Sequence, residues 1–190
     1  MNVQEATTRR LPDLKERHLP ENCRETINTI LKETYGYEQF RNLEIYDDLS
    51  KGKEKLCISQ GQLIENVILE AEKAWKSETQ VDNILLTAPT GSGKSLLFQL
   101  PAIYLGKEYN LLTIVVSPLK ALIVDQVESL QELGYTRVAY ASSDLSPEQK
   151  MEVYRQVREG EIDLFYLSPE LLLSYDIKHF VGERRIGLVV

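Results

Sequence analysis

The sequence predicts an α/β fold in which helices cover both faces of a parallel β-sheet, preceded by an N-terminal helical segment. Three observations carry this prediction. Short apolar runs alternate with amphipathic runs through residues 83–190, which is the pattern of repeated strand–helix units with parallel strands. A glycine-rich run at residues 88–95 joins the first strand-like segment to a helix-like one. Before residue 77, apolar residues instead recur at helical spacing.

Composition along the chain predicts three regions. Residues 1–20 are polar and contain prolines, so we expect a flexible N-terminal arm. Residues 21–76 form a helical region, with a charged and weakly periodic stretch around 42–58 that we interpret as a loop or insertion. Residues 77–190 form the α/β domain.

Two helices are predicted within the helical region. The first spans residues 21–34, and the second spans residues 62–76 with an apolar stripe along one side. Ser59 and Gln62 have the residue types and spacing of a capping box at the start of the second helix. The apolar residues that define the two helices are Ile27, Ile30 and Leu31, and then Leu63, Ile64, Val67, Ile68, Ala71 and Trp75.

The α/β domain is predicted to alternate strands and helices. Strands are expected at residues 83–87, 111–116, 137–141, 163–167 and 186–190. Helices are expected at residues 95–100, at 119–133, from Ser146 to Gly160, and after Ser168. Ser146 and Ser168 each precede a proline, which is favoured in the first helical turn, so both are expected to cap helices.

The glycine-rich run reads Ala-Pro-Thr-Gly-Ser-Gly-Lys-Ser and has the composition of a phosphate-binding loop. Gly91 and Gly93 allow the backbone to wrap around a phosphate with its N–H groups pointing inward, and the next helix adds its positive N-terminal end. Lys94 is expected to reach the β- and γ-phosphates, and the Ser95 hydroxyl to ligate Mg²⁺. The rest of the predicted loop is Pro89, Thr90 and Ser92. The alternative is a glycine-rich turn with an accidental Lys-Ser pair.

Net charge and cysteine content limit the possible functions. The chain has a net charge of −7, with 43% hydrophobic and 27% charged residues, so it does not bind nucleic acid through bulk positive charge, although a local basic groove is compatible with that charge. Cys23 and Cys57 lack metal-ligand spacing and indicate reduced thiols. No apolar run approaches the roughly 18 residues of a membrane span, and residues 1–10 lack the apolar core of a signal peptide. We therefore expect a cytoplasmic location and no membrane partner.

Four segments together resemble the RecQ-like DNA helicases of superfamily 2. Residues 89–102, Pro-Thr-Gly-Ser-Gly-Lys-Ser-Leu-Leu-Phe-Gln-Leu-Pro-Ala, are similar to the ATP-binding motif, and residues 115–127 resemble the motif with Ser-Pro-Leu and Asp-Gln-Val. Residues 164–170, Leu-Phe-Tyr-Leu-Ser-Pro-Glu, are similar to a later motif, and residues 30–41 resemble the adenine-sensing motif. The resemblance covers about residues 24–190, and its specificity lies in the order and spacing of the set.

The resemblance implies a RecA-like P-loop NTPase domain that binds ATP and Mg²⁺, with Tyr37 and Arg41 beside the adenine. In the family a glutamine closely follows the Phe-Arg pair, whereas here Asn42, Leu43 and Glu44 follow it. Either Glu44 takes that role, or an insertion displaces it to Gln62. We favour Gln62, because the helix after it continues as in the family and an amide can bond both a donor and an acceptor of adenine. The alternative is that Gln62 only caps its helix.

The resemblance also implies a nucleic-acid site where parallel strands end, which is where such sheets bind ligands. Small hydroxyls and helix N-termini can hold phosphate oxygens without reading bases, as a translocating motor requires. Arg184 and Arg185 are interpreted as a solvated charged turn. The predicted nucleic-acid residues are Ser117, Pro118, Leu119, Lys120, Ser143 and Ser168.

We therefore predict an ATP-dependent DNA helicase that translocates on single-stranded or partly duplex DNA and unwinds it. Residues 185–190 resemble the strand that delivers the family's acidic Mg²⁺-binding motif, and the sequence stops before that motif. The resemblance thus implies a truncated first motor domain, which alone should bind nucleotide poorly and hydrolyse almost none. Two alternatives stay open. One is another superfamily 2 motor, such as an RNA helicase or a duplex translocase, and the other is a nucleotide-regulated binding module without motor activity.

Overall fold

The computed structural model describes residues 17–46, 55–76, 83–86 and 91–190. Most of the predicted N-terminal arm lies outside these residues, and so do Pro89 and Thr90 of the predicted phosphate loop. Among the described helices, none combines the length and the apolar character that a bilayer crossing requires.

The centre of the structure is a four-stranded, entirely parallel sheet with the strand order β4-β5-β3-β6. This confirms the predicted parallel sheet and four of its strands. The central strands β3 and β5 are mostly apolar and buried, as expected of strands covered on both faces, whereas β6 is partly exposed. The strands are β3 (Leu112–Val116), β4 (Val138–Ala141), β5 (Leu164–Leu167) and β6 (Ile186–Val189).

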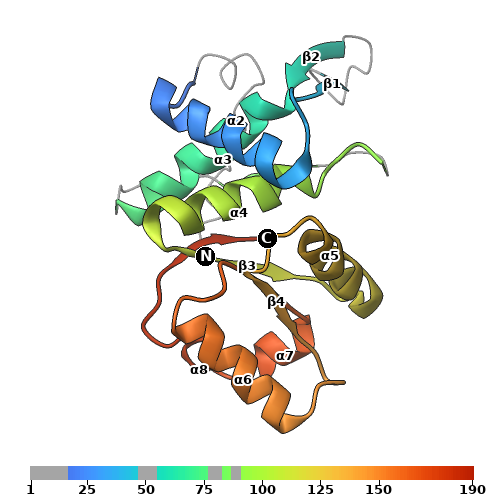
Figure 1. Cartoon of the computed structure of the whole chain (residues 1–190), viewed down its shortest axis with the longest axis vertical. Coiled ribbons are helices and arrows are strands. Elements are labelled where there is room, and N and C mark those ends of the chain that lie inside the picture. The colour runs from blue at the N-terminus through green and yellow to red at the C-terminus, as the bar shows by residue number, and fades with distance from the viewer. Residues whose placement is uncertain (1–16, 47–54, 77–82, 87–90) are drawn as a thin grey trace, which may run out of the picture.

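Helices cover both faces of the sheet, as predicted (Figure 1). Side chains alternate between the faces along a strand. Val115 and Tyr166 accordingly pack with α4 (Leu96–Tyr109) and α5 (Lys120–Glu132) on one face. Ile114 and Phe165, their neighbours in the chain, pack with the helices of the other face. Those helices are α6 (Pro147–Arg158), α7 (Pro169–Ser174) and α8 (Ile177–Val181).

The chain reverses direction across the sheet, and this creates a place for ligands. From β3 the chain crosses over β5 to β4 through α5, and it returns from β4 to β5 through α6 on the opposite face. The segments that leave the adjacent strands β3 and β5 therefore diverge to opposite faces. In open α/β sheets, the carboxyl ends of two such strands border a crevice that binds ligands.

A third layer of helices lies outside α4. It consists of α2 (Glu21–Tyr35) and α3 (Gln60–Trp75), whose buried residues form one core cluster with those of α4. Both predicted helices are confirmed. Because this cluster joins residues on both sides of position 77, the predicted regions 21–76 and 77–190 share a core.

The stretch at residues 42–58, predicted as a loop or insertion, is not a loop where the structure describes it. Strands β1 (Asn42–Tyr46) and β2 (Lys55–Ser59) pair antiparallel, with Leu43 opposite Ile58. Leu43 is half-buried and Ile58 is buried, whereas Glu44 and Cys57 are exposed. A two-stranded ribbon buries so few side chains that its sequence carries little apolar alternation, and we therefore missed it.

The predicted strand at residues 83–87 is also not observed. Residues 83–86 form neither helix nor strand, and Ile84, Leu85 and Leu86 are exposed. An apolar run alone does not make a strand, because a strand also requires a neighbouring strand edge for its N–H and C=O groups. Such pairing is a tertiary property that local pattern does not supply.

The predicted helix caps are mostly confirmed. Ser146 and Gln149 form a complete capping box, and the Ser168 hydroxyl accepts a hydrogen bond from the Leu171 N–H at 3.3 Å. The Ser59 hydroxyl caps α3 by accepting from the Gly61 N–H at 3.2 Å, so this helix begins two residues earlier than predicted.

A buried ionic cluster ties the amino-terminal ends of the strands together. The Asp163 carboxylate, only 3% exposed, accepts hydrogen bonds from Arg137 Nε at 2.6 Å, from an Arg184 guanidinium nitrogen at 2.9 Å and from the Tyr135 hydroxyl at 3.1 Å. The Arg184 side chain is 4% exposed and also donates to the Ile162 carbonyl. The interpretation of Arg184 as solvated is therefore wrong. The charged residues around Arg184 in the sequence do not reveal that its ion-pair partner, Asp163, is buried in the fold.

Candidate nucleotide and nucleic-acid sites

The described second half of the predicted phosphate loop has a backbone compatible with phosphate binding. Gly91 and Gly93 both have φ of +79°, a conformation that glycine adopts without strain. The loop runs directly into α4, with the Gly93 and Lys94 carbonyls accepting from the Leu96 and Leu97 N–H groups at 3.2 and 3.0 Å. Lys94 is exposed and sits just before the first turn of a helix, where the backbone offers positive partial charge to an anion.

Two serine hydroxyls of this loop make no bond that stabilises the fold among the described residues. Ser95 occupies the N-cap position of α4 but makes no side-chain capping bond, so its hydroxyl is not used to stabilise the helix. The Ser92 hydroxyl oxygen is buried and has no hydrogen-bond partner among the described residues. Buried polar atoms are normally paired, so Ser92 also indicates a site that a ligand completes.

Tyr37, a predicted adenine residue, lies just after the end of α2. Gly36 ends the helix in the left-handed conformation with φ of +69°. The Tyr37 N–H then donates to the Leu31 carbonyl at 3.4 Å, and the Tyr37 ring stacks on Tyr35 with centroids 6.5 Å apart and 12° between planes. Tyr37 is 49% exposed, so its ring offers a face that an adenine base can cover.

Gln60 links the adenine motif to the phosphate loop, and sequence reasoning missed it. Its side-chain oxygen accepts from the Arg41 N–H at 3.2 Å, while its own N–H donates to the Arg41 carbonyl at 2.9 Å. Its amide nitrogen donates to the Ser92 carbonyl at 3.3 Å. A Cβ added to Gly93 would lie 2.6 Å from that nitrogen, so this glycine also makes room for the glutamine.

Gln62, which we predicted to bond the adenine, does not contact the Arg41 backbone or the Ser92 carbonyl as Gln60 does. Its amide nitrogen donates to the Arg17 carbonyl at 2.7 Å, away from the loop. Along α3, residues two apart point in different directions, so only one of the two glutamines can face the phosphate loop. The signal in the sequence that could have indicated Gln60 is the glycine after it, Gly61. A Cβ at Gly61 would lie 2.6 Å from the Phe40 ring, so a glycine here lets Phe40 and Arg41 pack beside Gln60.

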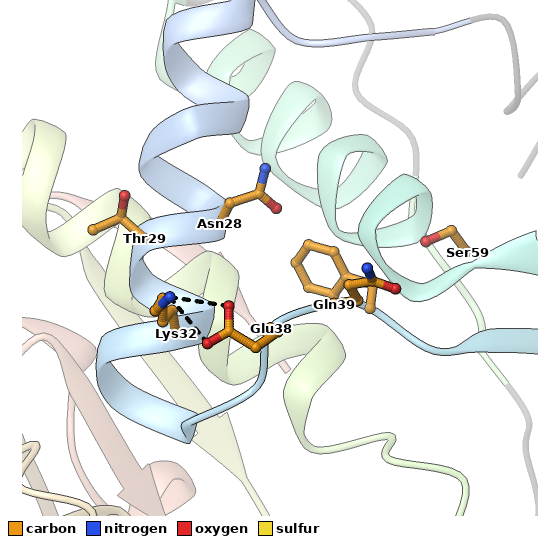
Figure 2. A pocket seen from close by; sticks show the side chains of 7 residues that line it. Asn28, Thr29, Lys32, Glu38, Gln39 and Ser59 are labelled. Carbon is orange, nitrogen blue, oxygen red and sulfur yellow. Dashed lines mark hydrogen bonds and ion pairs between the residues drawn. The ribbon is translucent and has the colours of Figure 1, made fainter.

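Two hollows lie beside the adenine motif, and Gln62 is the one predicted nucleotide residue among the described residues that border them. The larger, about 520 Å³, is bordered by Asn28, Gln39 and Ser59 and by the ion pair of Lys32 with Glu38 at 2.9 Å (Figure 2). The smaller, about 300 Å³, is bordered by Gln62 among others. The described residues around them do not include Lys94, Tyr37, Arg41 or Gln60. Both hollows are therefore distinct from the phosphate loop.

The two glutamines form a matched pair for a test. We expect Gln60→Ala to weaken ATP binding by about tenfold, because it removes two hydrogen bonds that place Arg41 and the loop. Gln62→Ala should leave ATP affinity within about twofold. Titration of the intact protein with a fluorescent ATP analogue measures both. Equal affinities, or a larger loss from Gln62→Ala, would contradict the role of Gln60.

The predicted nucleic-acid residues lie along one edge of the sheet, where β3, β4 and β5 end. The Ser117 N–H donates to the Leu167 carbonyl at 3.0 Å, which joins the ends of β3 and β5 at the crevice. The Lys120 ammonium donates to the Ser143 hydroxyl at 2.5 Å and to Asp144 at 2.9 Å, which joins the segments after β3 and β4. This ammonium also lowers the pKa of the Asp144 carboxyl.

The predicted residues at this edge differ in accessibility. Pro118, Leu119, Lys120 and Ser143 are exposed, with Leu119 at 62%. Ser168 is only 5% exposed and its hydroxyl caps α7. Capping is therefore the observed role of the Ser168 side chain, and the exposed hydroxyl and ammonium groups are those that can meet a phosphate.

Comparison with known proteins identifies the family. The model of DEAD/DEAH box helicases matches residues 68–190, which is more than half of the chain. The chain belongs to the DEAD/DEAH box helicase family. It is similar to the ATP-dependent DNA helicase RecQ of Synechocystis sp., with 32% identity over 165 residues, covering 87% of this chain and 28% of that relative. It is also similar to the ATP-dependent DNA helicase Q-like 5 of Arabidopsis thaliana, with 32% identity over 87% of this chain and 14% of the relative.

A third helicase relative is the ATP-dependent DNA helicase RecQ of Haemophilus influenzae, which is 30% identical over 86% of this chain and 21% of its own length. The chain thus spans less than a third of the length of these relatives. Within the DEAD/DEAH box helicases it is RecQ-like, which confirms the family predicted from the four motifs. The roles of its individual site residues stay predictions.

Proposed function

We propose that this chain is the ATP-binding part of a RecQ-type helicase that couples ATP hydrolysis to translocation on DNA and to its unwinding. One observation carries the proposal. Through Gln60, the backbone of the adenine motif at Arg41 is bonded to the phosphate loop at Ser92. An adenine-recognition segment and a phosphate-binding loop are thereby adjacent, as a bound adenine nucleotide requires.

In the proposed site, Tyr37 and Arg41 flank the adenine, while the loop from Gly91 to Ser95 surrounds the phosphates. Lys94 balances charge on the β- and γ-phosphates, and the Ser95 hydroxyl is a ligand for Mg²⁺, which neutralises phosphate charge when bound. Pro89 and Thr90 are proposed to complete the loop. DNA is proposed to cross the edge where the strands end, on the opposite side of the sheet's crevice, held by backbone contacts that carry no base specificity.

A cytoplasmic location is part of the same proposal. Cys23 and Cys57 are both free thiols, and free thiols are typical of proteins in reducing compartments.

ATP turnover of the intact protein tests this function. We expect single-stranded DNA to raise turnover severalfold and an RNA of the same sequence to raise it less, because the motifs are those of DNA helicases. Stronger stimulation by RNA would favour an RNA helicase, and stimulation by duplex without strand separation would favour a translocase. An ATP turnover rate that no nucleic acid changes would instead support a nucleotide-regulated binding module.

A further inference from the structure

Gln99 is a buried polar residue that the proposed site does not use. It lies near the start of α4, shortly after Lys94, and is only 5% exposed. Its carbonyl oxygen accepts from the Tyr35 hydroxyl at 3.3 Å. Its amide nitrogen donates to the Gln126 side-chain oxygen at 3.0 Å and to the Tyr166 hydroxyl at 3.3 Å. Both N–H donors and the carbonyl of one side chain are thereby engaged.

The two tyrosine hydroxyls that bond to Gln99 are neutral. Burial raises the pKa of Tyr35 well above its ordinary value and that of Tyr166 to about 12. Both hydroxyls therefore keep their protons at physiological pH. In the observed arrangement the Gln99 carbonyl meets the Tyr35 donor and its two N–H groups meet the oxygens of Gln126 and Tyr166, so the amide satisfies all three partners.

Each partner of Gln99 belongs to an element that carries a proposed ligand residue. Tyr35 stacks on Tyr37, on the adenine side. Gln126 lies on α5, the helix that begins at Lys120, and Tyr166 lies in β5, just before Ser168. Gln99 itself lies on the helix that begins at the phosphate loop. One amide group thus bonds directly to three elements that border the two proposed sites.

Stability alone does not account for this arrangement. Neutral buried hydrogen bonds contribute little net free energy, and apolar groups of the same shape can replace a fully paired set at little cost. What a saturated polar network adds is a defined relative placement of the elements that it joins. A shift of α2 against α5 or β5 would break at least one of these bonds and leave a buried group unpaired.

We propose that Gln99 is a positioning residue through which nucleotide binding and DNA binding are energetically coupled. The inference rests on the proposed function, since it requires both ligands. A nucleotide that covers Tyr37 favours one placement of Tyr35, and the amide transmits this preference to α5 and β5. By linkage, DNA bound at the edge of the sheet changes nucleotide affinity by the same factor.

The coupling factor is measured directly. In the intact protein, the dissociation constant of a fluorescent single-stranded oligonucleotide is determined with and without a non-hydrolysable ATP analogue, and the ratio is the coupling factor. Coupling of this kind is typically about 5- to 150-fold. We expect Gln99→Leu to bring the ratio close to one while each ligand alone binds within about threefold of wild type. Tyr35→Phe and Tyr166→Phe, which each remove one hydroxyl, should each lower the ratio in part.

Tyr154→Phe is the matched control for the two tyrosine variants. Tyr154 is buried, as Tyr166 is, but it packs against the opposite face of the sheet. It should leave the ratio unchanged. If Gln99→Leu does not fold, the two tyrosine variants decide the outcome. A wild-type ratio of one, or a ratio that survives in the variants that fold, overturns the coupling role. Failure of wild-type protein to bind either ligand would instead overturn the proposed function.

Discussion

Replacing Lys94 with alanine in the intact protein is expected to lower DNA-stimulated ATP turnover by about 10²–10³-fold, the usual cost of removing a preorganised charge from a phosphoryl-transfer site. Lys94 sits at the junction of the glycine turn and α4, where the Gly93 carbonyl already closes the first helical turn with Leu96. The backbone thus holds the lysine in position before nucleotide arrives. Steady-state turnover at saturating DNA measures the effect.

Lys107 provides the control for this substitution. It is an exposed lysine in the last turn of the same helix, so Lys107→Ala changes the net charge equally without touching the loop. We expect its turnover to stay within about twofold of wild type. Turnover that survives in Lys94→Ala would rule out ATP hydrolysis at this loop, whatever happens to the control.

Replacing Arg184 with alanine is expected to destabilise the sheet by about 3–5 kcal/mol, because it leaves the Asp163 carboxylate buried with part of its charge uncompensated. The Arg184 and Asp163 side chains are 4% and 3% exposed, so water cannot take the place of the guanidinium. Burial of the guanidinium itself lowers the pKa of Arg184. Hydrogen exchange of peptides from β3 and β5 in the intact protein measures the local free energy of opening.

The neighbouring Arg185 is exposed, and Arg185→Ala should change the opening free energy by less than about 0.5 kcal/mol.

A second substitution, at Gly106, tests the packing around the Asp163 carboxylate. A Cβ on Gly106 would lie 2.3 Å from the Asp163 carboxyl carbon, so Gly106→Ala should destabilise the sheet even though alanine favours helices. Equal protection in wild type and Arg184→Ala would refute the structural role of the cluster.

The sequence predicted most of the fold because its strong signals are local. The capping serines Ser146 and Ser168 begin their helices as expected, and the apolar runs that became β3 and β5 are buried on both faces. These signals depend on residues within one or two turns of each other. The ribbon of β1 and β2 lacked such a signal, since Ile58 is the one buried residue among those of its side chains that the structure describes.

The candidate sites were predicted as segments rather than as contacts. The motifs predicted the family, while the roles of the phosphate loop, the adenine motif and the sheet edge stay predictions. The sequence analysis weighed Glu44 against Gln62 and did not consider Gln60, because spacing along the chain cannot tell which of two nearby helical residues faces a loop 30 residues away. Gln99 had no signal beyond its place in a motif, since its partners come from three other elements.

Residue types and their order were sufficient to determine a parallel α/β domain with a phosphate loop and a place in a helicase family, because periodicity, caps and glycine conformations act over short distances. Only the tertiary structure decided that Gln60 bonds to the loop, that Arg184 is buried against Asp163, and that one amide joins three elements. Such contacts depend on how distant segments pack, and burial then determines whether a polar group is solvated or must find a partner.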